Sequence, residues 1–345
     1  MSQYKVSVVV PTFNTGDFLV ETFESFRCQT IGFENIEIIF VDDASSDDYT
    51  LDLLDEFDSC YSNVSSVFLD VNSGFPGTGR NVGLDLAQGE CVIFADHDDT
   101  YEENALEIMY NEIKYENADV VISNYYRVYD DIKIEEETIF AGGRAEVGNI
   151  SDDLRLFEIG PSIWTKLFKK DFLIKNNIRF LEGMLAEDLE LYVHILFLAD
   201  KIIYLDDFYS YNYRIRDSWD DKSTIHLRKK ETFENMIKGY YKIDKLLIEL
   251  NKEIYFSNIF RRHFIYWILS LGSSNISNDD KLELIRYINP LFKKQIQITP
   301  GFNEKQLSSL TKPILKDDYK KILRNIIRIK KVREFKSKIK NIFKH

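Results

Sequence analysis

Residues 79–99 read GRNVGLDLAQGECVIFADHDD, and this stretch decides the fold. Apolar residues recur at helical spacing over residues 78–87, and residues 91–95 form a short apolar run. That run leads directly into the acidic cluster DHDD at residues 96–99. A helix followed by a buried strand is typical of a sheet covered by helices. The stretch therefore predicts one helix–strand unit of an α/β fold, with polar residues where the strand ends.

The same alternation of helices and strands extends to both sides of this stretch. Short β-branched apolar runs predict strands over residues 5–10, 36–41, 64–69 and 119–123. Periodic segments predict helices over residues 17–27, 48–57 and 102–116. Strands that alternate with helices predict a doubly wound, mostly parallel sheet with helices on both faces. In such sheets a ligand binds beyond the carboxyl ends of the strands.

The second half of the chain has a less regular pattern. Strand-like segments cover residues 164–169 and 202–213, and an apolar helix is predicted over 187–198. From about residue 227 the pattern is helical to the end. A length of 345 residues suits two domains. We therefore predict an α/β domain over 1–225 and a helical domain over 226–345.

Composition excludes several classes of protein. With 44% hydrophobic and 29% charged residues, 15 Gly and 6 Pro, the chain is neither collagenous nor of low complexity. Its apolar runs are too short for a transmembrane helix, and the N-terminal run is too short for a signal peptide. Three widely spaced cysteines, Cys28, Cys60 and Cys91, favour a reducing compartment. We expect a cytoplasmic protein.

Charge is distributed unevenly along the chain. Residues 316–345 hold twelve Lys or Arg against three acidic residues, so this tail carries +9 of a net charge of −13. The remaining −22 on residues 1–315 argues against nucleic acid as a partner. The apolar residues of the tail recur every three or four positions: Ile322, Ile326, Ile329, Val332, Phe335, Ile339 and Ile342. Two interpretations stay open: a peripheral helix on the inner face of the cell membrane, or a helix packed on the protein body.

Three acidic clusters lie where the predicted sheet would bind a ligand. Asp42-Asp43 follows the second strand, Asp96-His97-Asp98 follows the fourth, and Glu187-Asp188 opens a later helix. Carboxylates without a Cys/His set suit Mg²⁺ or Mn²⁺, which commonly share their coordination with phosphate oxygens. The residues thus predict a metal–diphosphate site. The chain lacks the GxxxxGK[ST], GxGxxG and GxSxG loops, which argues against a P-loop kinase, a nicotinamide dehydrogenase and a serine hydrolase.

Five segments in order resemble the family 2 glycosyltransferases of GT-A fold, over about residues 4–216. They are VSVVVPTFN, FVDDAS, GRNVGLDLAQGECVIFADHDD, IWTKLFKKDFL and AEDLEL. The last two are similar to segments of bacterial enzymes that build capsule, teichoic-acid or exopolysaccharide chains. The resemblance implies an inverting hexosyltransferase that uses a UDP-sugar and Mn²⁺ or Mg²⁺. Its acceptor would be a hydroxyl of a cell-surface glycan, or of a lipid-linked or polyol-phosphate precursor.

The resemblance also assigns residues to the nucleotide. The turn after the first strand would border it mainly through backbone groups, with Pro11, Thr12 and Asn14. The alternative, for Asn14 above all, is a turn that only ends the strand. Asp43 would accept a hydrogen bond from the uracil imide; the alternative for this role is Asp42, which otherwise caps the next turn. Arg80 would approach the nucleotide or its diphosphate near a helix N-terminus. The alternative for Arg80 is a solvent-facing side chain.

The cluster after the fourth strand matches the DxD motif of the family. Asp98 would bind the metal directly, and Asp96 the ribose or a metal-bound water. His97 lies between them and is expected to point away, with contact to the nucleotide as the alternative. Asp99 is an alternative cap for the next helix.

The remaining assignments concern the sugar and the acceptor. Asp188 would be the general base that takes the acceptor proton, although acidic residues at a helix start also stabilise its dipole. Trp164 and Lys166 would line the acceptor or donor-sugar pocket, with Trp164 stacked on a sugar face. Arg214 and Arg216 would close over the diphosphate.

Two other functions compete with sugar transfer. One is a non-catalytic sugar-nucleotide or glycan-binding partner of such an enzyme, against which the intact carboxylate set argues. The other is a nucleotidyltransferase acting on a sugar phosphate. It is disfavoured because the first strand is followed by Pro11 and not by a Gly- and Lys/Arg-rich loop. The helical domain is in addition a candidate surface for a homo-oligomer.

Overall fold

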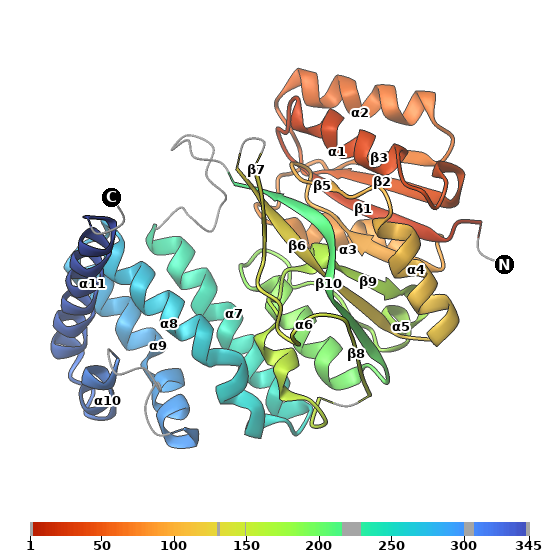
Figure 1. Cartoon of the computed structure of the whole chain (residues 1–345). Coiled ribbons are helices and arrows are strands. Elements are labelled where there is room, and N and C mark those ends of the chain that lie inside the picture. The colour runs from red at the N-terminus through yellow and green to blue at the C-terminus, as the bar shows by residue number, and fades with distance from the viewer. Residues whose placement is uncertain (1–2, 130–131, 149, 216–228, 300–306, 343–345) are drawn as a thin grey trace. The chain divides into compact units, whose positions relative to one another are not determined.

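The computed structural model separates the chain into two compact units, Met1–Asp217 and Ser218–His345 (Figure 1). It describes residues 3–129, 132–148, 150–215, 229–299 and 307–342, with side chains as far as residue 333. The predicted boundary between residues 225 and 226 lies outside these described residues. Each unit has its own core and is described by itself.

The first half of the sheet is parallel. Four strands lie side by side in the order β3-β2-β1-β4: β3 (Val64–Phe68), β2 (Ile36–Asp42), β1 (Val6–Thr12) and β4 (Cys91–Phe94). Every residue of β1, β2 and β4 is buried, which is why these strands are apolar on both faces. Because β1 pairs in parallel with both β2 and β4, the carboxyl ends of these three strands meet at one edge.

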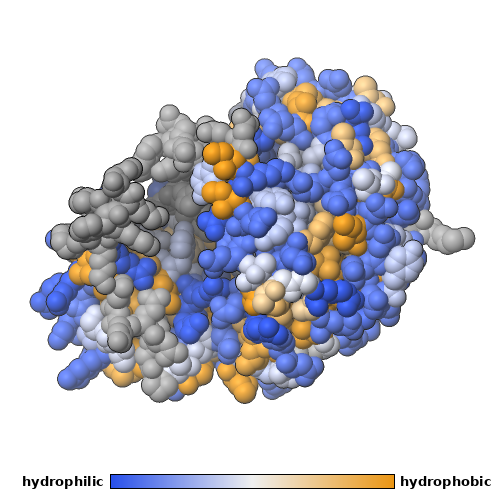
Figure 2. Space-filling model, in the orientation of Figure 1, coloured by the Kyte–Doolittle hydropathy of each residue, from blue (hydrophilic) through white to orange (hydrophobic). Residues whose placement is uncertain are grey.

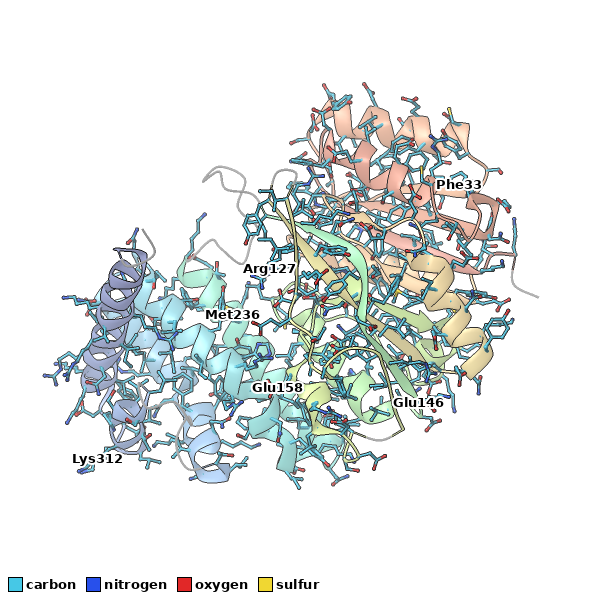
Figure 3. All side chains as sticks on the ribbon, in the orientation of Figure 1. Phe33, Arg127, Glu146, Glu158, Met236 and Lys312 are labelled. Atoms are coloured by element: carbon cyan, nitrogen blue, oxygen red, sulfur yellow. The ribbon has the colours of Figure 1, made fainter. Side chains whose placement is uncertain are left out.

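Helices cover both faces of this half. One face packs on α1 (Phe18–Arg27), α2 (Asp48–Cys60) and α4 (Ala105–Glu116), whose apolar residues share a core with Val8. On the other face lies α3 (Pro76–Leu86), where Gly83 approaches the side chain of Val9. Near α1, Phe33 of the short helix η1 (Phe33–Asn35) packs edge-on against Phe23, with ring centroids 6.1 Å apart (Figure 3).

The second half of the sheet is mixed. The order continues β4-β9-β6-β10-β5, and β9 pairs antiparallel with both β4 and β6. The strands are β9 (Lys166–Lys169), β6 (Val120–Tyr129), β10 (Ile202–Arg214) and β5 (Thr100–Tyr101). β6 and β10 are parallel to each other. β9 lies within the predicted strand-like segment 164–169, but its antiparallel direction was not predicted, because a four-residue apolar strand carries no signal for direction.

Short edge strands and helices complete this unit. β7 (Ile132–Glu135) pairs with β6, and β8 (Arg144–Val147) pairs with β10. Figure 2 shows an apolar patch over the β7 hairpin, where Ile132 and Ile134 are exposed. The remaining helices are η2 (Leu154–Glu158), η3 (Ile163–Thr165), α5 (Lys170–Lys175) and α6 (Glu187–Leu198). Of these, α6 begins with the predicted base and its acidic neighbour.

The second unit is helical. It consists of α7 (Lys230–Glu249), η5 (Glu253–Tyr255), α8 (Phe256–Ser273), α9 (Asn278–Ile298), α10 (Ser308–Leu315) and α11 (Tyr319–Ile342). Its core contains aromatic rings of α8 and α9. The ring centroids of Phe264 and Phe292 are 5.0 Å apart. Met236 of α7, which is labelled in Figure 3, is also buried. No helix within the described ranges has the length and apolarity needed to span a membrane.

The basic tail corresponds to α11. Its residues Ile322, Ile326 and Ile329 are buried within the helical unit, and Ile326 contacts α8 at Gly272. Of the two interpretations of the tail, the structure supports packing on the protein for this part of the stripe, and Val332 is exposed. The side chains of the other predicted stripe residues, Phe335, Ile339 and Ile342, lie outside the described part.

Candidate active site

The carboxyl ends of β1, β2 and β4 bring the loops that follow them to one edge of the sheet. Thr12, the last residue of β1, is in register with Asp42, the last residue of β2. The backbone N–H of Asp43 donates to the Thr12 carbonyl oxygen at 2.8 Å. The loop over residues 95–99 follows β4 at this edge, as the sequence predicts for a ligand site.

Arg80 of α3 connects the acidic clusters of this edge. Its Nη2 donates to Oδ1 of Asp96 at 2.9 Å, and its Nη1 donates to Oδ1 of Asp188 at 2.7 Å. Nη1 also lies 3.5 Å from Oε1 of Glu187. Arg80 is only 2% exposed, so the alternative of a solvent-facing side chain is wrong. One guanidinium thus joins the predicted DxD cluster to the predicted base, although 92 residues separate these carboxylates in sequence.

Burial and charge shift the pKa values of this cluster. Burial favours a neutral Arg80, but the charges of Asp188, Asp96 and Glu187 outweigh burial and raise its pKa. Burial and the neighbouring Asp188 raise the pKa of Glu187 to about 8. Burial also raises the pKa of Asp188, against the opposing effect of Arg80. A carboxylate with a raised pKa is a stronger base, which suits proton abstraction.

The start of α6 is fixed by contacts from α3. Asn81 pairs with the backbone of Phe180: its Nδ2 donates to the carbonyl oxygen at 3.0 Å, and its Oδ1 accepts from the N–H at 2.9 Å. The Arg80 guanidinium lies over the Phe180 ring, 5.2 Å from its centroid. Ala186 then adopts a left-handed conformation, with φ of 74°, directly before α6 begins. These contacts determine where Asp188 lies, and Asn81 and Ala186 were not predicted as site residues.

Gly77 allows the close approach of α3 to this segment. A Cβ at Gly77 would lie 2.3 Å from the carbonyl oxygen of Leu181, which is a backbone atom that cannot rotate away. We expect Gly77→Ala to push the segment before α6 outward and to lower turnover about tenfold or more, since small misplacements of catalytic groups are costly. Overpacking of this kind should also destabilise the fold by on the order of 1–3 kcal/mol. Turnover and thermal unfolding measure both effects.

A suitable control for this change is Gly148→Ala, because a Cβ there meets its nearest neighbour at an ordinary 3.6 Å. The control should keep both turnover and melting temperature near those of the unmodified protein. If Gly77→Ala behaves like Gly148→Ala, then the contact with Leu181 does not position α6.

The loop over residues 96–99 is held from two sides. From α1, the Thr22 hydroxyl donates to the carbonyl oxygens of His97 at 3.0 Å and Asp99 at 2.8 Å. From β10, Nε of Arg214 donates to the Asp98 carbonyl oxygen at 3.1 Å. Arg214 therefore contacts the loop over residues 96–99, and its closure over a diphosphate stays a prediction. Arg216, its predicted partner, lies outside the described residues.

The flanking residues of the loop have structural partners. His97 Nδ1 lies 2.9 Å from Oγ1 of Thr15. The buried Asp99 carboxylate accepts from the Tyr211 hydroxyl at 2.8 Å and from the backbone N–H of Arg214 at 2.7 Å. Burial and the charge of Asp96 raise the pKa of Asp99 to about 7. The predicted capping role of Asp99 is wrong, because the N-cap of α4 is Asn104.

Asp43, the residue predicted to bind uracil, and Asp42, its alternative, have different contacts. Asp42 is buried and accepts hydrogen bonds from the backbone N–H and the hydroxyl of Ser45, so it caps the turn after β2. Asp43 accepts from the backbone N–H groups of Ser73 at 2.8 Å and Gly74 at 3.2 Å. Asp43 therefore joins the loop after β2 to the loop before α3, at the edge where a nucleotide would bind.

The turn after β1 is built into the same edge. Pro11 packs against α3, where a Cβ at Gly79 would lie 3.1 Å from the proline Cβ. Asn14 has a φ of 47°, and its Oδ1 accepts from the backbone N–H groups of Ser46 at 2.9 Å and Asp47 at 3.0 Å. Asn14 thus holds two loops of the site together, which is the structural alternative to nucleotide contact.

Trp164 and Lys166 do not line an open pocket. Trp164 is 6% exposed, and its ring stacks on Tyr211 with centroids 4.2 Å apart. The prediction that it stacks on a sugar is therefore wrong, because neighbouring rings bury it. Lys166 is fully buried, and its ammonium group donates to the backbone carbonyl oxygens of Gly160 at 3.0 Å and Ser162 at 2.6 Å. It supports the segment before η3, and burial lowers its pKa to about 7.

The carboxylates at this edge fit a divalent cation that takes only part of its coordination from protein. Asp96 is 31% exposed at its side chain, and Asp98 is half-buried two residues further on. In the part of the chain that the structure describes, no group of three or more His, Cys, Asp or Glu residues is placed to hold a metal. Mg²⁺ is typically held by one or two carboxylates together with substrate phosphates and water. Asp96 and Asp98 match that requirement.

Comparison with known proteins identifies the family. The model of glycosyl transferase family 2 matches residues 7–175. Glycosyltransferase GlyG of Streptococcus pneumoniae serotype 4 is 34% identical over 215 residues, which are 59% of this chain and 68% of GlyG. The chain belongs to glycosyl transferase family 2. The predicted family and the prediction of a glycosyltransferase are thereby confirmed.

Two further comparisons extend beyond the matched domain. The poly(ribitol-phosphate) beta-glucosyltransferase of Bacillus spizizenii is 28% identical over 287 residues, 83% of this chain. The chain spans 44% of the length of that relative. The crystal structure of S. aureus TarS 1-349 in complex with UDP-GlcNAc is similar to this structure, with a TM-score of 0.75 and 23% sequence identity. The superposition covers 96% of this chain and 91% of the TarS chain. This likeness confirms the predicted GT-A fold with a helical C-terminal region.

Proposed function

We propose that this family 2 glycosyltransferase moves a sugar from a UDP-sugar to a hydroxyl of a polyol-phosphate polymer of the bacterial cell surface. The transfer inverts the anomeric centre in a single displacement. The observation that carries the proposal is the ion-pair cluster in which Arg80 joins Asp96 to Asp188. Asp96 and Asp188 contact the two terminal nitrogens of one buried side chain, and in the proposed reaction Asp96 would face the donor and Asp188 would be the base.

The donor end of the site is the edge formed by β1, β2 and β4. Asp43 and the turn from Pro11 to Asn14 are the groups that would border the uridine. Asp96 and Asp98 would hold a divalent cation, Mn²⁺ or Mg²⁺, which when bound neutralises the charge that develops on the departing diphosphate. The UDP-GlcNAc complex of the structurally similar TarS supports a UDP-sugar donor.

The acceptor end is the start of α6. Asp188 takes the proton of the acceptor hydroxyl as the new glycosidic bond forms, and its raised pKa suits this role. Only one carboxylate is required because no covalent intermediate is formed. The β-linked product in the name of the Bacillus relative supports inversion, since sugars in UDP donors are commonly α-linked.

The name of the Bacillus relative supports a polyol-phosphate acceptor, but the negative charge of this chain would repel such a polymer. The Bacillus relative is named for poly(ribitol phosphate), which is strongly anionic. Residues 1–315 of this chain carry a net charge of −22, so an anionic acceptor requires basic residues gathered locally at its groove. Membrane contact through residues 316–345, a cytoplasmic location and a homo-oligomer stay predictions.

A release assay tests the proposed function. The purified chain is incubated with each of several UDP-sugars and Mn²⁺ or Mg²⁺, and free UDP is measured with and without poly(ribitol phosphate). We expect one or two donors to release UDP, and the polymer to raise the rate at least tenfold. UDP that binds but is never released from any UDP-sugar would instead favour the non-catalytic partner.

A further inference from the structure

The buried guanidinium of Arg80 forms ion pairs with carboxylates from two separate segments of the site. Both terminal nitrogens point to carboxylates, Nη2 to Asp96 at 2.9 Å and Nη1 to Asp188 at 2.7 Å. A planar guanidinium fixes the angle between its donors, so it sets the relative position of two carboxylates in a way that a lysine ammonium cannot. Arg80 therefore spans the distance between the donor side and the acceptor side of the site.

Arg80 is held in place by the close packing of α3 against β1 and by the ring of Phe180. A Cβ at Gly79 would lie 3.1 Å from Pro11, and one at Gly83 would lie 2.3 Å from Val9, so α3 is pressed against β1 on both sides of Arg80. The Phe180 ring covers the guanidinium. Because α3 is fixed on the sheet, Arg80 also fixes the positions of the carboxylates that it contacts.

The charge of Arg80 is more than matched by its protein partners. Its two short contacts are with the carboxylates of Asp96 and Asp188, which together already carry more negative charge than the guanidinium carries positive charge, so little positive charge is left for a diphosphate. Among the described residues, Nε of Arg80 is buried without a hydrogen-bond partner, an arrangement that costs stability. The two terminal nitrogens bind carboxylates from two different segments of the site, which points to a role in positioning these carboxylates.

We propose that Arg80 is a positioning residue, which holds Asp188 in the orientation needed for proton abstraction and fixes it relative to Asp96. The inference rests on the proposed function, because it takes Asp188 as the base. It differs from the sequence-based expectation that Arg80 contacts the nucleotide, since here Arg80 acts through Asp188 and not on the substrate.

The test compares Arg80→Lys and Arg80→Ala with Arg27→Ala. Arg27 is a suitable control because it is exposed on α1 and, among the residues whose side chains are described, its ion pair is with Glu24, three residues earlier on the same helix, at 2.7 Å. For Arg80→Lys we expect kcat to fall about 10- to 100-fold, since a misplaced base costs rate, while the Kd for UDP changes by less than about threefold. Guanidinium ion added to Arg80→Ala should restore part of the lost kcat. The control should leave all three quantities unchanged.

A double-mutant cycle shows whether Arg80 acts through Asp188. In an Asp188→Asn background, Arg80→Lys should lower the residual rate of UDP release by no more than about twofold, because residues that act together are not additive. A full 10- to 100-fold further loss would overturn the inference. So would a tenfold weaker UDP affinity at unchanged kcat, which would make Arg80 a diphosphate ligand. Arg80→Lys retains the charge, so thermal unfolding of this variant separates a folding defect from a loss of rate.

Failure of the inference is distinguishable from failure of the proposed function. If the unmodified protein releases no UDP from any donor, then the proposed function is wrong. If the unmodified protein transfers sugar, but the rate losses caused by Arg80→Lys and Asp188→Asn multiply in the double variant, then the proposed function stands and Arg80 does not position the base.

Discussion

Replacing Asp188 by Asn is expected to lower sugar transfer by about 10²- to 10⁴-fold, the usual contribution of a general base. The amide of Asn cannot accept the acceptor proton, but it keeps the size of the side chain and one oxygen for Arg80, which now contacts Asp188 Oδ1 at 2.7 Å. UDP affinity should change by less than about threefold, since Asp188 lies on the acceptor side. Steady-state kinetics and UDP titration measure the two effects.

The pH dependence of the rate gives a second readout of Asp188. Burial raises the pKa of Asp188, and only the deprotonated carboxylate can act as a base. The rate should therefore fall as the pH is lowered through this pKa, and Asp188→Asn should lose that acidic limb. Asp85→Asn is the matched control, because Asp85 is an exposed carboxylate that also pairs with an arginine, Arg179, at 2.8 Å. Near-normal turnover in Asp188→Asn would show that another group takes the proton.

Loss of the proposed metal ion is expected to lower the rate of sugar transfer by a similar factor. We expect Asp98→Ala, and separately the addition of EDTA to the unmodified protein, to lower transfer at least about 10²-fold, because the charge that develops on the diphosphate would no longer be neutralised. Asp98→Ala should also remove the dependence of UDP affinity on Mn²⁺ concentration. Asp85→Ala again serves as the control. Full turnover in excess EDTA would exclude a metal requirement.

The positions of the acidic clusters could be predicted because each lies next to a local signal. An apolar run identifies a buried strand, and the residue after its end must lie at the edge of the sheet. This reasoning placed Asp43 and Asp96 at one edge, and the helix that begins at Glu187 was predicted with its start at the observed residue. The fold class followed from the same alternation.

The partners of the site residues could not be predicted in the same way. Arg80 and Asp188 are 108 residues apart, and nothing in the local sequence shows that their side chains meet. The left-handed conformation of Ala186 has no sequence signal, because alanine rarely adopts it. The burial of Trp164 depends on Tyr211 of a distant strand. The glycines around Gly77 are visible in the sequence, but the approach of Gly77 to the Leu181 backbone was not predicted, because glycine spacing alone does not show which segment lies against it.

In the proposed reaction, a cation joins the carboxylates after β4 to the diphosphate of a sugar nucleotide. Crystals grown with Mn²⁺ and UDP, with diffraction collected at the manganese absorption edge, test it most directly. We predict an anomalous peak within bonding distance of a carboxylate oxygen of Asp98 and of the diphosphate, with the uracil next to Asp43. A bound UDP without this peak, or a UDP bound away from the edge formed by β1, β2 and β4, would contradict the account.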